Sequence, residues 1–198
     1  MIAVADVAPT DPTVTTEDFP AVQIGRKLDI ACGQNKQEGW IGIDICKTDQ
    51  ADIVHDLRVT PWPIESESID EARASHFFEH LDGQERIRFM NELYRVLKPG
   101  RGCIFITPYG YDRQVQDPTH KWPPVVDATY LYFDKQWLHA NGLSHYIEML
   151  GIDCDFQVQP LSASVAPEFG GRSDQFKMMA VKQYRNGGYD LVVQVVKR

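Results

Sequence analysis

The stretch "KLDIACGQNKQEGWIGIDIC", Lys27 to Cys46, decides the fold. It contains two short apolar runs, Leu28–Ala31 and Trp40–Ile45, joined by a loop, and each run carries an aspartate, Asp29 or Asp44. Strand-length apolar runs separated by loops and helices are typical of a parallel sheet that is covered on both faces. This stretch therefore predicts two neighbouring strands of an open α/β sheet.

The pattern continues through two further runs, "ADIVHDL" and "IDEARASHFF", and then changes to a helical period. In "DGQERIRFMNELYRVLKPG" Asp82 can cap a helix with Glu85 three residues later, and Lys98-Pro99-Gly100 can end it. The apolar stripe of this helix consists of Ile87, Met90, Leu93, Tyr94 and Leu97. The apolar run Cys103–Thr107 follows as a buried strand, so helix and strand alternate.

The C-terminal third predicts more helix and then antiparallel strands. "DKQWLHANGLSHYIEMLGI" has a helical pattern that breaks near Asn141-Gly142. In "FKMMAVKQYRNGGYDLVVQVVKR" two β-rich runs flank Arg185–Gly188, which is a hairpin signal. We therefore expect the sheet to end in an antiparallel hairpin.

Composition limits the classes of function. The chain has 198 residues, 43% of them hydrophobic, and so has room for one domain, which we place at residues 24–198 after a flexible N-terminal arm, residues 1–23. Twenty basic against 28 acidic residues give a net charge of -8, which favours a small-molecule partner over nucleic acid. No apolar run approaches the ~20 residues of a membrane span. Four scattered cysteines without a C-x-x-C pair or a secretory leader indicate reduced thiols in the cytoplasm.

The aspartates and the glycine after the first strand predict a nucleoside site. Ligands of open α/β sheets bind at the carboxyl ends of the strands. There, Gly33 lets the backbone approach a ligand, Asn35 tolerates a left-handed conformation, and Asp44 can accept hydrogen bonds from two ribose hydroxyls. Asp56 would accept from an exocyclic amino group such as that of adenine. Each aspartate can instead cap a turn or lie in solvent. The G-x-G-x-x-G fingerprint is absent, so a nucleoside without phosphates fits better than a dinucleotide.

The motifs together resemble those of class I S-adenosylmethionine-dependent methyltransferases. "LDIACGQNK", "GIDI", "ADIVHDL", "IDEARASHFFEHL" and "LYRVLKPGRGCIFITPY" are similar to five successive family motifs, over about Lys27 to Tyr109. "DPTHKW" and "YLYFDKQWL" also resemble small members common in bacteriophage genomes. Ala31 stands at a position where the family usually has glycine, and Asn35 stands at a position where many members have a second glycine. The resemblance implies a Rossmann-like open sheet of about seven strands, mostly parallel with an antiparallel C-terminal hairpin, and helices on both faces.

The resemblance also implies the cofactor, S-adenosylmethionine, whose product is S-adenosylhomocysteine, and the residues that hold it. Residues near the methionine end would be Asp29, Ala31, Gly33 and Asn35. Asp44 with Ile45 would hold ribose, Asp56 with Leu57 would face adenine, and His76 and Phe77 would line the pocket.

Methyl transfer is an in-line displacement that needs alignment and, where the acceptor carries a proton, a base. The long aromatic loop after the Cys103–Thr107 strand is the expected acceptor region. We select His120 as general base, since an imidazole accepts protons near neutral pH, with Tyr109 and Tyr130 as further catalytic candidates. The alternative is that the aromatic rings of this loop only cover the sheet edge.

Two other possibilities concern a metal and a different activity. His76, Glu79 and His80 could converge with His120 on Mg²⁺, Mn²⁺ or Zn²⁺, but the pattern also resembles many members without metal, so no metal is predicted. A DNA amino methyltransferase is disfavoured, because no Asn or Asp precedes Pro-Pro and an aromatic residue after "ARAS". A non-catalytic methyltransferase-fold subunit is the first rival, a nicotinamide-dependent dehydrogenase the second. The sequence also leaves a homodimer open.

Overall fold

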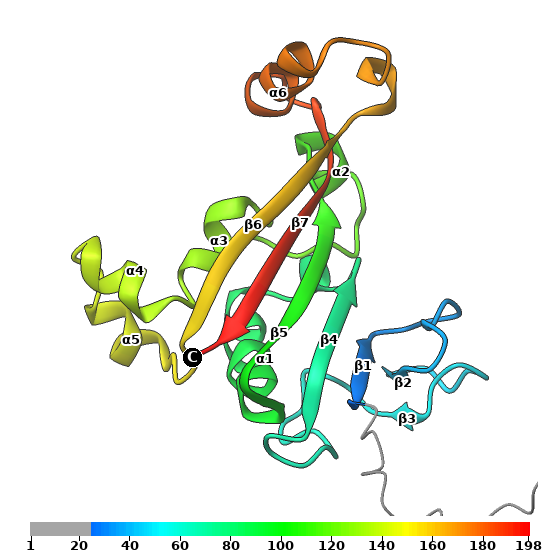
Figure 1. Cartoon of the computed structure of the whole chain (residues 1–198), viewed down its shortest axis with the longest axis vertical. Coiled ribbons are helices and arrows are strands. Elements are labelled where there is room, and N and C mark those ends of the chain that lie inside the picture. The colour runs from blue at the N-terminus through cyan, green and yellow to red at the C-terminus, as the bar shows by residue number, and fades with distance from the viewer. Residues whose placement is uncertain (1–24) are drawn as a thin grey trace, which may run out of the picture.

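A seven-stranded sheet forms the centre of the molecule, with strand order β3-β2-β1-β4-β5-β7-β6 (Figure 1). The computed structural model describes residues 25–198, apart from the side chains of Pro160 and Leu161, so the predicted arm, residues 1–23, lies outside the described residues. The strands are β1 Lys27–Ile30, β2 Ile41–Asp44, β3 Ile53–Val54, β4 Ile69–Ser75, β5 Leu97–Pro108, β6 Phe156–Val165 and β7 Gly188–Lys197.

The strand directions confirm the predicted sheet. Strands β3, β2, β1, β4 and β5 are parallel, β7 runs antiparallel to β5, and β6 runs antiparallel to β7. Strand order reverses next to β1, whose Ile30 pairs with Ile43 of β2 on one side and with Ala74 of β4 on the other. The carboxyl ends of these three strands therefore meet at one edge, where a ligand is expected.

Helix α1, Gly83–Val96, forms as its sequence predicts. The Asp82 carboxylate accepts a hydrogen bond from the Glu85 backbone N–H, and the Glu85 side chain accepts one from the Asp82 N–H. This capping box satisfies two N–H groups that the helix itself leaves free. The other helical segments are η1 Phe78–His80, α2 Tyr111–Val115, α3 Asp127–Leu131, α4 Lys135–Ala140, α5 His145–Leu150, η2 Pro167–Phe169 and α6 Asp174–Gln183.

An aromatic cluster joins the helices to the sheet. Phe105 of β5 contacts Phe78 of η1, Phe89 of α1 and Tyr130 of α3, with ring centroids 5.1 to 6.2 Å apart. All four rings are buried. Removing one such ring leaves a cavity and costs about 3–5 kcal/mol, so this cluster holds η1 and the following residues against the sheet.

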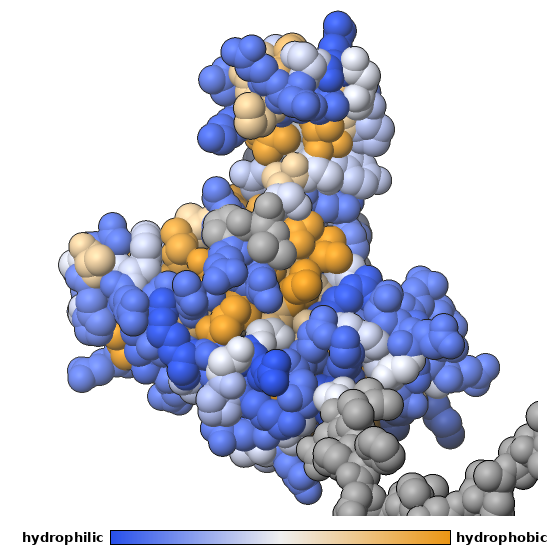
Figure 2. Space-filling model, in the orientation of Figure 1, coloured by the Kyte–Doolittle hydropathy of each residue, from blue (hydrophilic) through white to orange (hydrophobic). Residues whose placement is uncertain are grey.

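The opposite face of the sheet carries different side chains. Strand residues alternate between faces, so Ile104, Ile106 and Val192 point away from the Phe105 side. They are only partly buried. Figure 2 shows hydrophobic residues at the surface of this face, over β5 and β7. Helices α1 and α3 pack on the Phe105 side of the sheet. The sequence predicts helices on both faces, and these two helices cover one of them.

Two predicted elements change, and one predicted break is confirmed. The predicted hairpin of two strands around Arg185–Gly188 is wrong, because Phe176–Gln183 belongs to α6 and the partner of β7 is β6. The Ser173 hydroxyl accepts from the Phe176 N–H and starts this helix, which Met, Lys, Gln and Ala favour. Strand β5 begins at Leu97, directly after α1, and is longer than predicted. The break near Asn141-Gly142 between α4 and α5 is confirmed.

All four cysteines are free thiols, and three of them are buried. Within residues 25–198, none of the helices has the length and apolar character needed to cross a bilayer.

Candidate active site

A cavity of about 390 Å³ lies at the carboxyl ends of β1, β2 and β4. It is lined by residues that follow these strands and β3, namely Ala31, Asp44, Ile45, Asp56, Leu57, Arg58, His76, Phe77, His80 and Leu81. Its volume falls in the range of small-molecule sites. The pocket brings together most of the residues that the sequence predicts to bind the cofactor, from four separate segments of the chain.

Asp44 is the central carboxylate of this pocket. It is 9% exposed, and its two oxygens accept hydrogen bonds from the N–H groups of Gly33, 2.9 Å, and Cys46, 2.8 Å. These bonds fix the orientation of the carboxylate and tie the loop after β1 to the end of β2. Each oxygen keeps a further lone pair for a ligand hydroxyl.

Asp29, Gly33 and Asn35 do not line the cavity. The Asp29 carboxylate is buried, accepts from the Gln37 N–H at 2.8 Å and lies 3.4 Å from the Arg73 guanidinium. Asp29 therefore fixes the loop after β1 through its hydrogen bond with the Gln37 N–H. Gly33 has φ +54°, a conformation that glycine adopts without strain, and Asn35 is exposed. These three residues shape the loop rather than the cavity wall.

Asp56 forms a two-pronged ion pair with Arg58, a residue that the sequence reasoning missed. Arg58 Nε lies 2.9 Å from Oδ1 and Nη2 lies 2.7 Å from Oδ2. The hydrogen bonds from Arg58 lower the pKa of Asp56 to about 2, against a smaller opposing effect of burial. Asp56 is therefore ionised near neutral pH, and the guanidinium, which is strongly exposed, shares the pocket rim with it.

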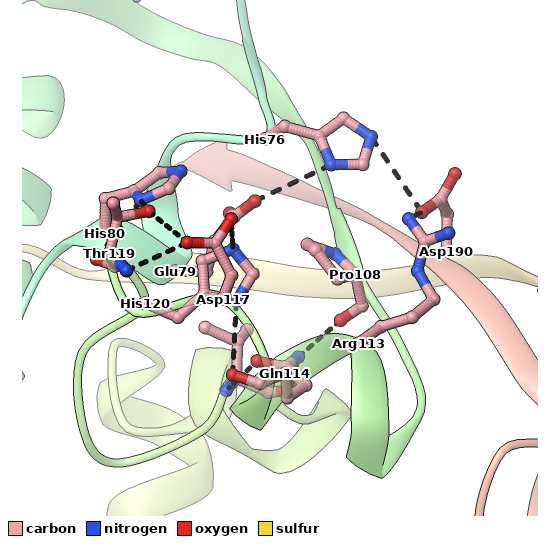
Figure 3. Close-up of polar contacts among 11 residues, drawn as sticks. His76, Glu79, His80, Pro108, Arg113, Gln114, Asp117, Thr119, His120 and Asp190 are labelled. Atoms are coloured by element: carbon pink, nitrogen blue, oxygen red, sulfur yellow. Dashed lines mark hydrogen bonds and ion pairs between the residues drawn. The ribbon is translucent and has the colours of Figure 1, made fainter.

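His76 stands at the end of β4 between two carboxylates. Its Nδ1 lies 3.6 Å from Glu79 Oε1 and its Nε2 lies 3.8 Å from Asp190 Oδ1 (Figure 3). The pKa of His76 is raised by the Glu79 side chain and by the charge of Asp190, with desolvation opposing. Its φ is +52°, which is unusual for a residue with a side chain. The Glu79 and Asp190 carboxylates therefore favour the protonated form of the His76 imidazole.

The predicted general base, His120, lies beside the pocket rather than in its wall. Its ring packs against that of His80, which lines the cavity, with centroids 4.9 Å apart. Its Nδ1 lies 3.1 Å from the Gln114 carbonyl and its Nε2 lies 3.8 Å from Asp117 Oδ2. His80 and Leu81 also line the pocket, although the cofactor residues predicted from the sequence extend only to Phe77.

The two tyrosines lie elsewhere. Tyr109 lines a second cavity of about 330 Å³, together with Gly110, Gln114 and Val125. Tyr130 is fully buried, stacks on Phe78 at 5.3 Å and lines neither cavity. Burial raises the pKa of Tyr130 far above its ordinary value, so its hydroxyl is no base near neutral pH. Tyr130 is therefore part of the hydrophobic core and lies outside both cavities.

A larger, more open hollow of about 640 Å³ lies between α1, α3 and α5. It is mostly apolar and contains none of the residues predicted to bind the cofactor or to act in catalysis. The aromatic loop contributes Tyr132 and Phe133 to it, whereas Trp122 is exposed. The aromatic side chains of this loop therefore lie in three places: the core, the surface and the wall of this hollow.

Comparisons with known proteins agree with the fold. Residues 28–105 match the family model described as a methyltransferase domain. No curated protein matches the sequence. An S-adenosylmethionine-dependent methyltransferase from Archaeoglobus fulgidus is 21% identical, with a TM-score of 0.55 over 87% of this chain and 86% of that one. The YcgJ protein from Bacillus subtilis is 13% identical, with a TM-score of 0.50 over 88% and 92%.

At these identities the solved structures show a common fold, whereas the family match spans the segment from β1 into β5, which contains every residue that lines the pocket. The chain thus shares its fold with solved S-adenosylmethionine-dependent methyltransferases, and its residues 28–105 match the model of a methyltransferase domain.

Proposed function

We propose that the protein transfers a methyl group from S-adenosylmethionine to a small-molecule acceptor by in-line displacement. The observation that carries this proposal is the cavity at the carboxyl ends of β1, β2 and β4, where Asp44 ends β2 and Asp56 lies just after the neighbouring strand β3. The cavity also holds the apolar side chains Ile45, Leu57 and Phe77, which suit a nucleobase.

Different pocket residues would bind different parts of the cofactor. Asp44 would accept hydrogen bonds from ribose hydroxyls, because its orientation is already fixed by two backbone N–H groups. Leu57 and Phe77 would pack on adenine, with the Asp56–Arg58 pair at its polar edge. The cofactor itself supplies an activated methyl group on a sulfonium centre.

The acceptor would approach from the side of His120 and Tyr109. His120 contacts the Gln114 carbonyl, and Gln114 lines the cavity that contains Tyr109. Because the His120 ring also packs against His80 of the cofactor pocket, it lies between the two cavities. A proton on an acceptor placed there could pass to an imidazole nitrogen of His120. The net charge of -8 favours a small molecule over nucleic acid as acceptor.

The test is a turnover assay with methyl-labelled S-adenosylmethionine and pooled small metabolites, read by mass spectrometry for labelled product and S-adenosylhomocysteine. We expect a labelled product whose yield falls at least tenfold in Asp44→Ala. Cofactor binding without any labelled product from small-molecule, protein or RNA pools would favour the non-catalytic subunit instead. Binding of NAD but not of S-adenosylmethionine would revive the dehydrogenase.

A further inference from the structure

We propose that Glu79, His80 and His120 bind one divalent transition-metal cation at the edge of the pocket. Each of the three offers a ligand atom, and these atoms lie within 4.8 Å of one another. Glu79 and His80 come from η1, and His120 comes from the loop after α2, so the fold brings together residues about 40 apart in the chain. Figure 3 shows the three side chains gathered beside Asp117 and Thr119.

The first argument is the environment of Glu79. Its side chain is 1% exposed, and neither carboxylate oxygen has a hydrogen-bond partner within residues 25–198. The nearest basic nitrogen among the described residues is His76 Nδ1, which lies 3.6 Å from Glu79 Oε1, beyond hydrogen-bond distance. A buried carboxylate without partners is strongly unfavourable, and a bound cation is one of the few groups that satisfies it.

The second argument is the tautomer of the two histidines. His80 Nδ1 lies 3.3 Å from the Thr119 carbonyl, and His120 Nδ1 lies 3.1 Å from the Gln114 carbonyl. A carbonyl only accepts, so each Nδ1 carries the proton and each Nε2 keeps its lone pair. The Thr119 hydroxyl donates to Asp117 at 2.6 Å and therefore accepts from His80 Nδ1 as well. Metal-binding histidines in proteins are oriented in this way, by a carbonyl behind the ring.

The donor set selects the kind of cation. Two imidazole nitrogens and one carboxylate suit Zn²⁺ and its first-row neighbours, whereas Mg²⁺ and Ca²⁺ prefer oxygen ligands only. Bonds of about 2.1 Å place tetrahedral ligand atoms about 3.4 Å apart, so the side chains must move together by ~1 Å. Asp117 Oδ2 lies 3.8 Å from His120 Nε2 on the exposed side and is not part of the three-residue cluster.

The position of the site gives the cation a use. His80 lines the cofactor cavity, so an open coordination position there could take an oxygen of the methyl acceptor and lower its pKa. In the metal-bound protein His120 would have no free nitrogen, because its Nε2 would bind the cation and its Nδ1 proton faces the Gln114 carbonyl, so the cation would replace His120 as the group that activates the acceptor. This last point rests on the proposed function, but metal binding does not. The sequence predicted no metal because His76-x-x-Glu79-His80 is ambiguous, and only the burial of Glu79 and the two carbonyl contacts distinguish it.

The experiment is titration of the chelator-treated, full-length protein with ZnCl₂, CoCl₂, MnCl₂ and MgCl₂ by calorimetry, with the visible absorption of Co²⁺ as a second readout. We expect one equivalent of Zn²⁺ or Co²⁺ to bind and Mg²⁺ to bind far more weakly. Glu79→Gln and His120→Ala should each weaken Zn²⁺ binding by about 100-fold or more, since loss of even an outer partner costs roughly 10–100-fold. His145→Ala, an exposed histidine on α5, is the matched control and should bind as wild type.

Absence of Zn²⁺, Co²⁺ and Mn²⁺ binding to the folded protein would overturn the proposal, as would binding that survives both ligand variants or is lost in His145→Ala. If a variant fails to fold, the wild-type protein still decides, because specific binding raises its melting temperature and gives an ordered Co²⁺ spectrum. Since no cofactor is present in the titration, failure here leaves the methyltransferase proposal standing.

Discussion

Ala31 and His76 follow two paired strands, β1 and β4, and share the same left-handed backbone conformation, with φ of +53° and +52°. Both line the cavity at the carboxyl ends of these strands. Backbone strain of this kind persists where the surrounding structure enforces it and is common at functional sites. The two residues turn the chain sharply at the rim of the pocket.

Ala31→Gly should relieve this strain. The left-handed conformation costs alanine about 1–2 kcal/mol, and glycine loses about 0.5–1 kcal/mol more chain entropy on folding. We therefore expect the free energy of unfolding to rise by about 0–1.5 kcal/mol in urea denaturation. Ala128→Gly, at an exposed position in α3, should lower it by about 1 kcal/mol. If Ala31→Gly lowered the free energy of unfolding as much as Ala128→Gly does, the left-handed conformation of Ala31 would be contradicted.

Arg58→Ala should change how stability depends on pH. In the folded protein Arg58 lowers the pKa of Asp56 to about 2, below its unfolded value of about 3.9. A depressed carboxyl pKa stabilises the fold above the unfolded pKa, and this contribution is lost as pH falls through the folded pKa. Wild type should therefore exceed Arg58→Ala in stability at pH 7, and the difference should shrink between about pH 4 and pH 2. A difference that stays constant down to pH 2 would show that Arg58 acts through packing instead.

Asp82→Ala tests the start of α1, which carries the residues packed under the pocket. The Asp82 carboxylate accepts from the Glu85 N–H at 2.9 Å. Loss of such a cap costs about 0.5–2 kcal/mol, so we expect the free energy of unfolding, measured by thermal denaturation, to fall by an amount in this range. Asp82→Ser, which keeps an acceptor, should lose only a few tenths of a kcal/mol by the same principle. Equal losses in both variants would mean that the charge of Asp82, rather than its cap, stabilises the helix.

Tyr130→Phe separates the core role of this residue from a catalytic one. The Tyr130 hydroxyl is buried, and no hydrogen-bond partner for it occurs in the described part of the chain. Removal of an unsatisfied buried hydroxyl is neutral or stabilising, by up to about 1 kcal/mol. We expect Tyr130→Phe to keep wild-type stability and methyl transfer, measured by S-adenosylhomocysteine release. A loss of turnover in the folded variant would restore Tyr130 as a catalytic candidate.

The sequence predicts those parts of the fold that local chemistry determines. The Asp82 and Glu85 pair, the apolar Cys103–Thr107 run and the Asn141-Gly142 break each specify their own structure, and each was found. Phe176–Gln183 misled the interpretation because its apolar residues suit a strand as well as a helix, and packing on β6 selects the helix.

The site was predictable as far as strand ends determine it. Ala31, Asp44, Asp56 and His76 each end or follow a strand, so the sheet gathers them. Asp29 is different, because a buried carboxylate under the loop looks the same in sequence as one in the pocket. Burial of Tyr130 and the unpaired carboxylate of Glu79 depend on how η1 and α3 pack on Phe105, which a single sequence does not specify.

The most direct test of the account is isothermal calorimetry of the purified protein with S-adenosylmethionine, S-adenosylhomocysteine and NAD. We predict micromolar binding of the first two and none of NAD. Asp44→Ala should weaken binding by about 1.5–3 kcal/mol, or roughly 10–150-fold, the range for a hydrogen bond to a charged group. Asp49→Ala, an exposed residue outside the cavity with the same charge change, should bind as wild type. Unchanged affinity in a folded Asp44→Ala protein, or binding of NAD alone, would contradict the assignment of the pocket.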